Sequence, residues 1–333
     1  MKSGEILVRV LYTTICGSDI HTYCGRREEP PHVVLGHEIV GEILEMDGGH
    51  PGTDMRANPI SVGDRVIWSI FSVPPGNEAP RADMPQKSPN LFKYGHAASV
   101  GDDIFNGGLA EYCVLRNDTV LIKISHRLPL KIAATISCAH ATVMGAMRIA
   151  GDVSGKKVMV FGAGLLGLTC LAMCREAGAV WTGLMDIDQS RLTWGKKFAA
   201  NEIFHSPEGS AFSKSWPDVD FVFDMTGNPR VMRIGIDSLN TGGIAIWIGA
   251  VYPEKPVSVD AQQIVRKLLQ IRGLHNYNYE DFLHATVFIE NNYQKYPYEE
   301  LIEKEYGLDE VEAAFAFASE HKPVRVGISI TQA

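Results

Sequence analysis

The pattern of hydrophobic and polar positions changes once along the chain, near Thr135. Before that point, apolar residues form short runs at 6–12, 39–44, 63–68 and 107–114, each bounded by glycine or polar residues. Short runs with this punctuation predict β-strands, and no long amphipathic helix accompanies them. We therefore expect the first part of the chain to be β-rich.

Residues 71–93 interrupt this β-rich part. They contain five prolines among polar side chains: Pro74, Pro75, Pro80, Pro85 and Pro89. Clusters of proline and polar residues are typical of loops. We expect a long surface excursion here.

After Thr135 predicted strands and helices alternate. An apolar helix at 133–149 ends before Gly151. The strands predicted beyond it lie at 156–161, 181–185, 221–224 and 244–248, with a helix at 168–177. This alternation predicts an α/β fold with a parallel, doubly wound sheet, the Rossmann architecture. The tail adds an amphipathic helix at 309–318 and a closing strand at 325–330.

These patterns divide the chain into two domains. Residues 1–138 and 274–333 are expected to form the β-rich domain, and residues 139–273 the domain with the parallel sheet. A length of 333 residues is sufficient for two substantial cores.

Composition narrows the class of protein. Hydrophobic residues make up 45% of the chain and charged residues 21%, as in ordinary soluble enzymes. A net charge of -8 without a basic run argues against nucleic acid or an anionic membrane as a partner. The nearly apolar stretch 158–174 is short for a membrane span and contains three glycines. With no signal-peptide core and six dispersed cysteines, the chain is expected to be cytoplasmic.

A glycine-rich turn between a predicted strand and a predicted helix matches the dinucleotide-binding fingerprint. The cofactor-binding candidates around it are Gly162, Gly164, Leu165, Leu166, Gly167, Asp186 and Arg191. The glycines let the backbone approach a pyrophosphate, which the N-terminus of the helix attracts. Asp186 would accept from both ribose hydroxyls and repel a 2′-phosphate, which favours NAD over NADP. A chance glycine cluster is the alternative, but strand, helix and acid all fall at the expected spacing.

Residues 16–38 carry the ligand types of a catalytic zinc site. The segment contains Cys16, Gly17, Ser18, Asp19, Ile20 and His21 and, after a loop, Gly36, His37 and Glu38. Thiolate, imidazole and carboxylate groups hold zinc, and a catalytic site keeps one position open. Cys138 is a candidate further ligand, although a free cysteine at the start of an apolar helix is usually a core residue.

Together these motifs resemble the zinc-dependent medium-chain dehydrogenases/reductases, the family of alcohol and polyol dehydrogenases. The matching motifs are 16–21, 36–38, 63–66, Gly107 with Gly108, Cys138 with Thr142, and 162–167. Residues 23–27, 85–87, 91–96 and 275–277 look most like the branch of alcohol dehydrogenases associated with phosphonate catabolism. The resemblance covers nearly the whole chain and implies that the β-rich domain is a GroES-like catalytic domain.

The resemblance also implies roles for the residues of the metal segment. Cys16, His37 and Cys138 would ligate a catalytic zinc ion. Glu38 would be a nearby carboxylate that exchanges with the substrate position, and Asp19 would orient His37.

The implied reaction is hydride transfer between an alcohol and NAD, with zinc as the Lewis acid. Ser18 and His21 would carry the alcohol proton towards solvent by way of the cofactor ribose. A helix-capping serine and a surface histidine are the alternatives for these two residues. Arg325 would reach back to the pyrophosphate.

Two departures from the family pattern stand out. The four cysteines that often hold a second, structural zinc are absent from residues 71–93, where Ser88 replaces the last of them. The chain also starts late, so about two strands of the catalytic domain are expected to be missing. That leaves a predicted exposed edge near residues 6–10, which a partner subunit of a homodimer or homotetramer would cover.

The substrate is the least specified part of this prediction. Arg26, Arg27, Lys93 and His96 lie in segments that resemble substrate-side loops, and they would suit a phosphonate or another anion. Solvated surface charges and a neutral polyol or simple alcohol are the alternatives. Another function class also stays open, a zinc-free quinone or enone reductase or a non-catalytic NAD-binding protein of the same fold, against which the intact Cys16, His37 and Cys138 argue.

Overall fold

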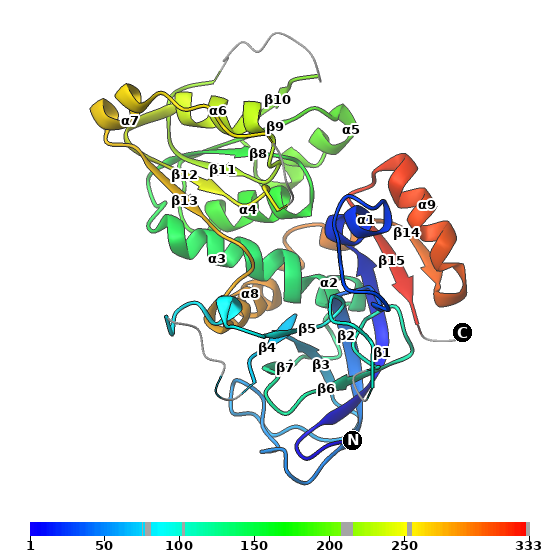
Figure 1. Cartoon of the computed structure of the whole chain (residues 1–333). Coiled ribbons are helices and arrows are strands. Elements are labelled where there is room, and N and C mark those ends of the chain that lie inside the picture. The colour runs from blue at the N-terminus through cyan, green and yellow to red at the C-terminus, as the bar shows by residue number, and fades with distance from the viewer. Residues whose placement is uncertain (75, 77–80, 102–103, 208–215, 252–254, 331–333) are drawn as a thin grey trace. The chain divides into compact units, whose positions relative to one another are not determined.

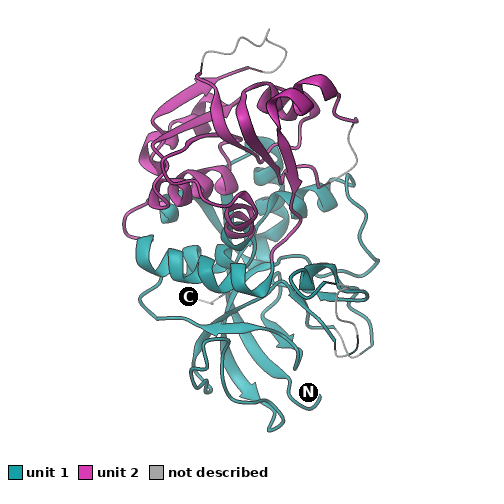
Figure 2. Cartoon of the chain, turned by 90° about the vertical axis from the view of Figure 1, so that its left-hand side faces the viewer, with its two compact units in different colours: residues 1–141, 278–293, 298–333 teal, residues 142–277, 294–297 magenta. Residues whose placement is uncertain are grey.

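A computed structural model describes residues 1–74, 76, 81–101, 104–207, 216–251 and 255–330. The chain forms two compact units (Figure 2). The first contains residues 1–141, 278–293 and 298–333, and the second residues 142–277 and 294–297. The first unit therefore runs three residues past the expected boundary at 138, and the chain returns to it at Asn278, the N-cap of a helix, rather than at 274.

The first unit is built on a seven-stranded sheet (Figure 1). Its strands are β1 (Ile6–Ile15), β2 (Glu38–Met46), β3 (Arg65–Trp68), β6 (Tyr112–Leu115), β7 (Leu121–Lys123), β14 (Ile302–Gly307) and β15 (Arg325–Ser329). The order is β14-β15-β1-β2-β3-β7, with β6 paired to β1. Val8, Val10, Ile43 and Val66 fill the core that this sheet encloses. The β-rich prediction is confirmed, and the closing strand predicted at 325–330 is β15.

The predicted exposed edge near residues 6–10 is wrong. β2 pairs with β1 on one side from Ile6 onward, and β6 pairs with the segment Ile6–Arg9 on the other side. Val8 and Val10 are completely buried. The periodicity of β1 gave no indication that a strand about 100 residues later covers its second side.

The segment 71–93 is not simply a surface excursion. Its ends pair as the two short strands β4 (Phe71–Ser72) and β5 (Phe92–Lys93), with a 3-10 turn at Pro85–Lys87 between them. Phe71 is buried and its ring stacks on Tyr279, with 5.1 Å between centroids. Residues 75 and 77–80 of the predicted excursion lie outside the described residues. Apolar packing of this hairpin therefore holds the segment 71–93, which contains no cysteine that could bind a structural zinc.

Helices complete the first unit. They are α1 (Gly17–Tyr23), α2 (Leu130–Thr135), α8 (Tyr279–Asn292) and α9 (Val311–His321), with short 3-10 turns at Tyr298–Leu301 and Leu308–Glu310. The helix predicted at 133–149 is a run from α2 to α3 (Ala141–Ala150) that contains a π-helical turn at Ile136–His140. This run is long and apolar enough to cross a membrane by composition, but 72% of its apolar 18-residue window is buried, as in a core helix.

The second unit contains a six-stranded parallel sheet in the order β10-β9-β8-β11-β12-β13. Its strands are β8 (Lys157–Phe161), β9 (Trp181–Asp186), β10 (Glu202–His205), β11 (Val219–Asp224), β12 (Leu239–Trp247) and β13 (Gln270–Gly273). The helices after α3 are α4 (Leu165–Glu176), α5 (Gln189–Leu192), α6 (Pro229–Asp237) and α7 (Ala261–Lys267), with a 3-10 turn at Gly195–Phe198. The predicted doubly wound parallel sheet is confirmed.

Candidate active site

Three potential metal ligands meet in the first unit. Cys16 lies between β1 and α1 as the N-cap of the helix, His37 directly precedes β2, and Cys138 lies in the middle of the π-helical turn. The ligand atoms of Cys16, His37 and Cys138 all lie within 4.8 Å of one another. The structure therefore brings together, from three distant segments, the residues that the sequence proposed as zinc ligands.

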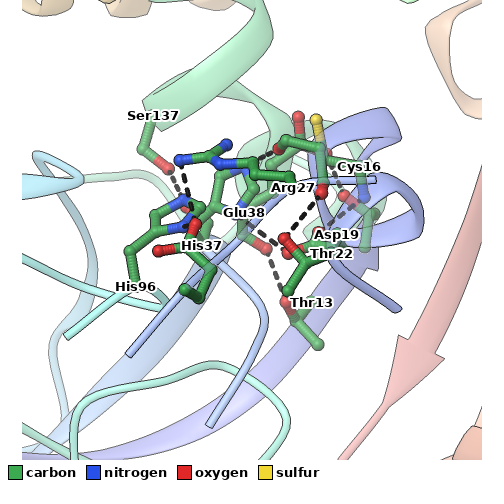
Figure 3. Close-up of polar contacts among 12 residues, drawn as sticks. Thr13, Cys16, Asp19, Thr22, Arg27, His37, Glu38, His96 and Ser137 are labelled. Carbon is green, nitrogen blue, oxygen red and sulfur yellow. Dashed lines mark hydrogen bonds and ion pairs between the residues drawn. The ribbon is translucent and has the colours of Figure 1, made fainter. Parts of the chain in front are cut away.

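Asp19 connects two of these segments (Figure 3). Its Oδ2 accepts a hydrogen bond of 2.8 Å from the backbone N–H of Cys16, and its Oδ1 lies 3.2 Å from Nδ1 of His37. Asp19 and His37 are both buried. Because a carboxylate only accepts, Asp19 fixes the proton of His37 on Nδ1 and leaves Nε2 as the ligand nitrogen.

The loop before His37 is held by tight backbone packing. The backbone N–H of Gly108 donates to the carbonyl of Gly36 at 2.8 Å. A Cβ at Gly107 would lie 2.0 Å from the carbonyl oxygen of Val34, so only glycine fits there. This explains why Gly107 and Gly108 belong to the same motif as His37.

The charges at the cluster fit a divalent metal. The contact between the two thiols lowers the pKa of Cys16, which Arg325 and His37 lower further against the effect of burial, whereas the same contact and burial raise the pKa of Cys138. Burial alone would lower the pKa of His37, but Asp19 and Cys16 raise it to about 10. Cys16 is therefore the thiol that loses its proton more readily. Two thiolates and one imidazole are a zinc donor set, and zinc binding would displace the remaining thiol proton.

Glu38 and Arg325 form a buried ion pair next to the cluster. Nε of Arg325 donates to Oε2 of Glu38 and Nη2 donates to Oε1, both at 3.0 Å, and Nη2 lies 3.6 Å from Sγ of Cys16. Thr14 donates a further short hydrogen bond to Glu38. Glu38 is not one of the clustered ligands, and Arg325 contacts this carboxylate. Their predicted roles, metal exchange and pyrophosphate binding, stay predictions.

Ser18 and His21 lie on α1, directly after Cys16. Oγ of Ser18 is 3.4 Å from Nε2 of His37, the nitrogen that would bind the metal. His21 is half-buried, and its pKa is lowered by burial and by the charges of Arg26 and Arg27. A neutral His21 at pH 7 is able to accept a proton, as the predicted relay requires.

A second group of charged residues lies beside His37. The sequence analysis identified Arg27 and His96 in this group as candidate site residues but missed Glu29. Nη2 of Arg27 is 2.9 Å from Oε1 of Glu29, which contacts Nδ1 of His96 at 2.7 Å. The ring of His96 packs on that of His37 with 4.8 Å between centroids, and burial lowers its pKa to about 4. Glu29 carried no recognisable sequence signal, because its partner His96 is 67 residues away.

Lys93 belongs to the same group. Burial and the charge of Arg27 together lower the pKa of its ammonium to about 8, although the charges of Cys138 and Glu29 oppose the shift. The structure thus brings Arg27, Lys93 and His96 together near the metal ligands. For Arg26 it shows only the effect on His21.

The predicted dinucleotide turn lies in the second unit. Gly164 is the N-cap of α4, which begins at Leu165, three residues earlier than predicted, and continues through Leu166. A Cβ at Gly167 would lie 1.7 Å from the carbonyl oxygen of Gly162, so the helix can pack on the turn only with glycine there. The N-terminus of α4 offers unpaired amides for a phosphate.

Asp186 is the last residue of β9, beside this turn. Its Oδ2 accepts from the backbone N–H of Ala163 at 2.5 Å and its Oδ1 from that of Asp188 at 2.8 Å. Asp188 caps α5, and Nε of Arg191 lies 3.9 Å from its carboxylate. Asp186 is thus held at the end of the strand, and the cofactor contacts of Asp186 and Arg191 stay predictions.

Two protein-family models match the chain. Residues 2–126 match the alcohol dehydrogenase GroES-like domain, and residues 166–291 match the zinc-binding dehydrogenase domain. The first match contains Cys16 and His37, and the second contains Gly167 and Asp186.

Curated relatives cover nearly the whole chain. An L-threonine 3-dehydrogenase of Streptomyces avermitilis is 28% identical over 95% of this chain and 89% of its own length. A D-xylulose reductase of Scheffersomyces stipitis is 27% identical over 87% of this chain and 80% of its own.

Solved structures show the same fold. An alcohol dehydrogenase from Thermotoga maritima superimposes with a TM-score of 0.91 at 24% identity, covering 99% of this chain and 93% of its own. A benzyl alcohol dehydrogenase from Acinetobacter calcoaceticus gives 0.82 at 21% identity, with the same coverage of both chains.

Proposed function

Because the chain belongs to the zinc-dependent medium-chain family of alcohol dehydrogenases, we propose that it transfers a hydride between an alcohol and NAD. The observation that carries this proposal is the convergence of Cys16, His37 and Cys138 within 4.8 Å. When bound, zinc would supply Lewis-acid activation of the hydroxyl, and NAD would supply the hydride acceptor.

The residues around the ligands have separate tasks in this reaction. Asp19 holds the imidazole of His37 in the tautomer that presents Nε2. The hydroxyl of Ser18, 3.4 Å from that nitrogen, accepts the proton that the alcohol loses and releases its own proton towards the cofactor ribose and His21. His21, neutral at pH 7, passes the proton on to solvent.

Metal content tests the proposal directly. We expect one zinc per chain, since the described residues contain one group of suitable ligands and residues 71–93 contain no cysteine. Purified protein is analysed for zinc and assayed with a panel of alcohols, with NAD and with NADP. About two zinc ions per chain would contradict the single-site assignment. Turnover of enones without metal would favour the zinc-free reductase, which the buried ligand set argues against.

NAD preference is the second part of the proposal, and Asp186 supports it. Its carboxylate stands at the end of β9 beside the glycine turn, where a 2′-phosphate would meet a negative charge. Among structural neighbours, a dehydrogenase from Sinorhizobium meliloti was solved with NADP and one from Escherichia coli with NADH. The acid at position 186 is therefore the feature on which our choice of NAD rests.

Replacement of Asp186 by serine should shift the cofactor preference. We expect the ratio of kcat/KM with NADP to that with NAD to rise about 10- to 100-fold, because one charge repulsion and the ribose hydrogen bonds are lost. Steady-state kinetics with both cofactors measure the ratio. A thermal melt checks that losing the hydrogen bonds from Ala163 and Asp188 leaves the fold intact. A wild-type enzyme that prefers NADP would remove Asp186 from the ribose site.

The substrate, we further propose, is an alcohol that carries an anionic group such as a phosphonate. Arg27 and Lys93 bring two cationic side chains to the neighbourhood of Cys138 and His96, and Arg27 is paired with Glu29. An anion would relieve the repulsion that lowers the pKa of Lys93, and Arg27 offers a planar fork of donors.

Replacement of Lys93 by methionine tests the anionic subsite. We expect KM for a hydroxyalkyl phosphonate to rise about 10- to 100-fold, the value of one hydrogen bond to a charged group. KM for a neutral alcohol of the same length should stay within a factor of two or so. Lys304→Met, at an exposed position on β14, is the matched control. Equal increases in KM for both substrates would show that Lys93 does not distinguish an anionic substrate from a neutral one.

We also propose that the protein is a homo-oligomer in the cytoplasm. β13 is an edge strand of its sheet, and Ile271 on it and Val265 on α7 expose apolar surface. Light scattering after size exclusion determines the number of chains.

A further inference from the structure

Cys138 occupies an unusual piece of backbone. The helical run from Leu130 to Ala150 changes to π-helical geometry at Ile136–His140, with Cys138 in the middle of that turn. A π-helical turn is less favourable than the α-helix it replaces and is usually found at functional sites. Some interaction must therefore keep this turn from relaxing into the α-helix that flanks it on both sides.

One side-chain hydrogen bond spans the whole π-helical turn. Oγ1 of Thr135, the residue before the turn, lies 3.0 Å from Nε2 of His140, its last residue. The same Oγ1 donates its single proton to the carbonyl of Ile132 at 2.8 Å. Nε2 of His140 must therefore be the donor to Thr135. The spacing of five residues is that of the backbone hydrogen bonds in a π-helix.

The surroundings fix this pair in place. Thr135 and His140 are both buried, and the ring of His140 packs edge-on against Tyr298 with 5.0 Å between centroids. Within the turn, the single hydroxyl proton of Ser137 is within reach of two carbonyls, that of Ala134 at 3.4 Å and that of His37 at 3.5 Å. Two contacts thus hold the segment of Cys138 in place. One runs from Ser137 to the segment of His37, and the other is the hydrogen bond between Thr135 and His140, which we call the clamp.

We propose that Thr135 and His140 are positioning residues, whose hydrogen bond maintains the π-helical turn and so places Sγ of Cys138 within ligand distance of Cys16 and His37. The proposal rests on the zinc site of the proposed function. Relaxation of the turn to α-helix would rotate Cys138 about the helix axis and move its sulfur relative to the other two ligands, which come from separate segments. Neither Thr135 nor His140 belongs to the group of three clustered ligands in the described part of the chain.

The experiment compares two buried threonines. Thr135→Val removes the clamp at nearly constant volume. Thr286→Val, in α8 of the same unit, removes a similar buried hydrogen bond, from Thr286 to the carbonyl of Phe282, that has no histidine partner. Zinc affinity is measured by competition with a chelator. Cobalt-substituted protein reports ligand geometry through its absorption spectrum. In metal-free protein, the alkylation rate of Cys138 is followed by mass spectrometry.

We expect Thr135→Val to weaken zinc binding about 10- to 100-fold, the range for groups that support metal ligands. It should also alter the cobalt spectrum and the alkylation rate of Cys138, and Thr135→Ser, which keeps the hydroxyl, should restore all three. His140→Phe should match Thr135→Val, and the double variant should add nothing further. Thr286→Val should behave as wild type in the same assays.

Equal behaviour of Thr135→Val and Thr286→Val in zinc affinity, spectrum and alkylation would overturn the proposal. So would independent, additive effects of the Thr135 and His140 variants. If the wild-type protein bound no zinc, the proposed function would fail, and the alkylation rate would still decide whether the clamp sets the position of Cys138.

Discussion

Replacement of Cys16 by serine is expected to lower kcat/KM at least about 10³-fold, because it removes one of three zinc ligands and with it several kcal/mol of transition-state stabilisation. The serine hydroxyl is a poor substitute for a buried sulfur whose pKa is lowered by Cys138, Arg325 and His37. Zinc content should fall together with activity, measured on the same preparation.

Binding of NAD separates this effect from general damage. The glycine turn and Asp186 belong to the second unit, so fluorescence titration with NADH should give nearly the wild-type dissociation constant. Cys24→Ser is the matched control, because Cys24 is an exposed thiol that follows the same helix. Full activity in the Cys16 variant would exclude Cys16 from the site.

The second large effect is expected for Ser18. Its hydroxyl is the group on α1 that lies next to Nε2 of His37, so Ser18→Ala should lower kcat by about 10²- to 10⁴-fold, the usual value of a positioned acid–base group. His21→Gln should cost less, because water can replace the outer member of the relay. Small amine bases should restore part of the His21→Gln rate.

The pH profile distinguishes a relay from a structural role of His21. Burial and the neighbouring arginines hold the pKa of His21 below 6.5, so it is a base at pH 7 and becomes protonated only in the more acidic range below 6.5. Alcohol oxidation by the wild type should decline in that range, and the His21→Gln variant should lack this decline. A deuterium isotope effect establishes that hydride transfer limits the rate. An unchanged rate and profile in the variant would refute the relay.

Sequence reasoning succeeded where a motif is local. Cys16 and His37 each lie in a short motif, and the structure brings them together with Cys138, whereas the roles of Ser18, His21 and Glu38 stay predictions. The strand and helix alternation after Thr135 likewise predicted a parallel sheet, which the structure has. The edge strands β10 and β13 were not predicted, because exposed residues dominate them and leave no apolar run.

What the sequence could not predict depends on contacts between distant segments. Arg325 and Glu38 form an ion pair although they are 287 positions apart in the sequence, and no local pattern predicts this pairing. The covering of β1 by β6 is a similar case, since a strand's periodicity shows which faces are buried and not which neighbour buries its edges. The π-helical turn at Cys138 was hidden as well, because its residues have the same apolar character as the α-helices on either side.

The single carboxylate of Asp19 contacts both the start of α1 and the imidazole of His37. One oxygen accepts from the backbone N–H of Cys16, the N-cap of α1, and the other lies against the imidazole of His37. Anything that strengthens the contact to His37 therefore also orders the first turn of this short helix, and fraying of the helix loosens the imidazole. Metal binding and the local unfolding of residues 17–23 are therefore thermodynamically linked. Tighter metal binding should slow amide hydrogen exchange in that helix, so the exchange rate reports metal affinity.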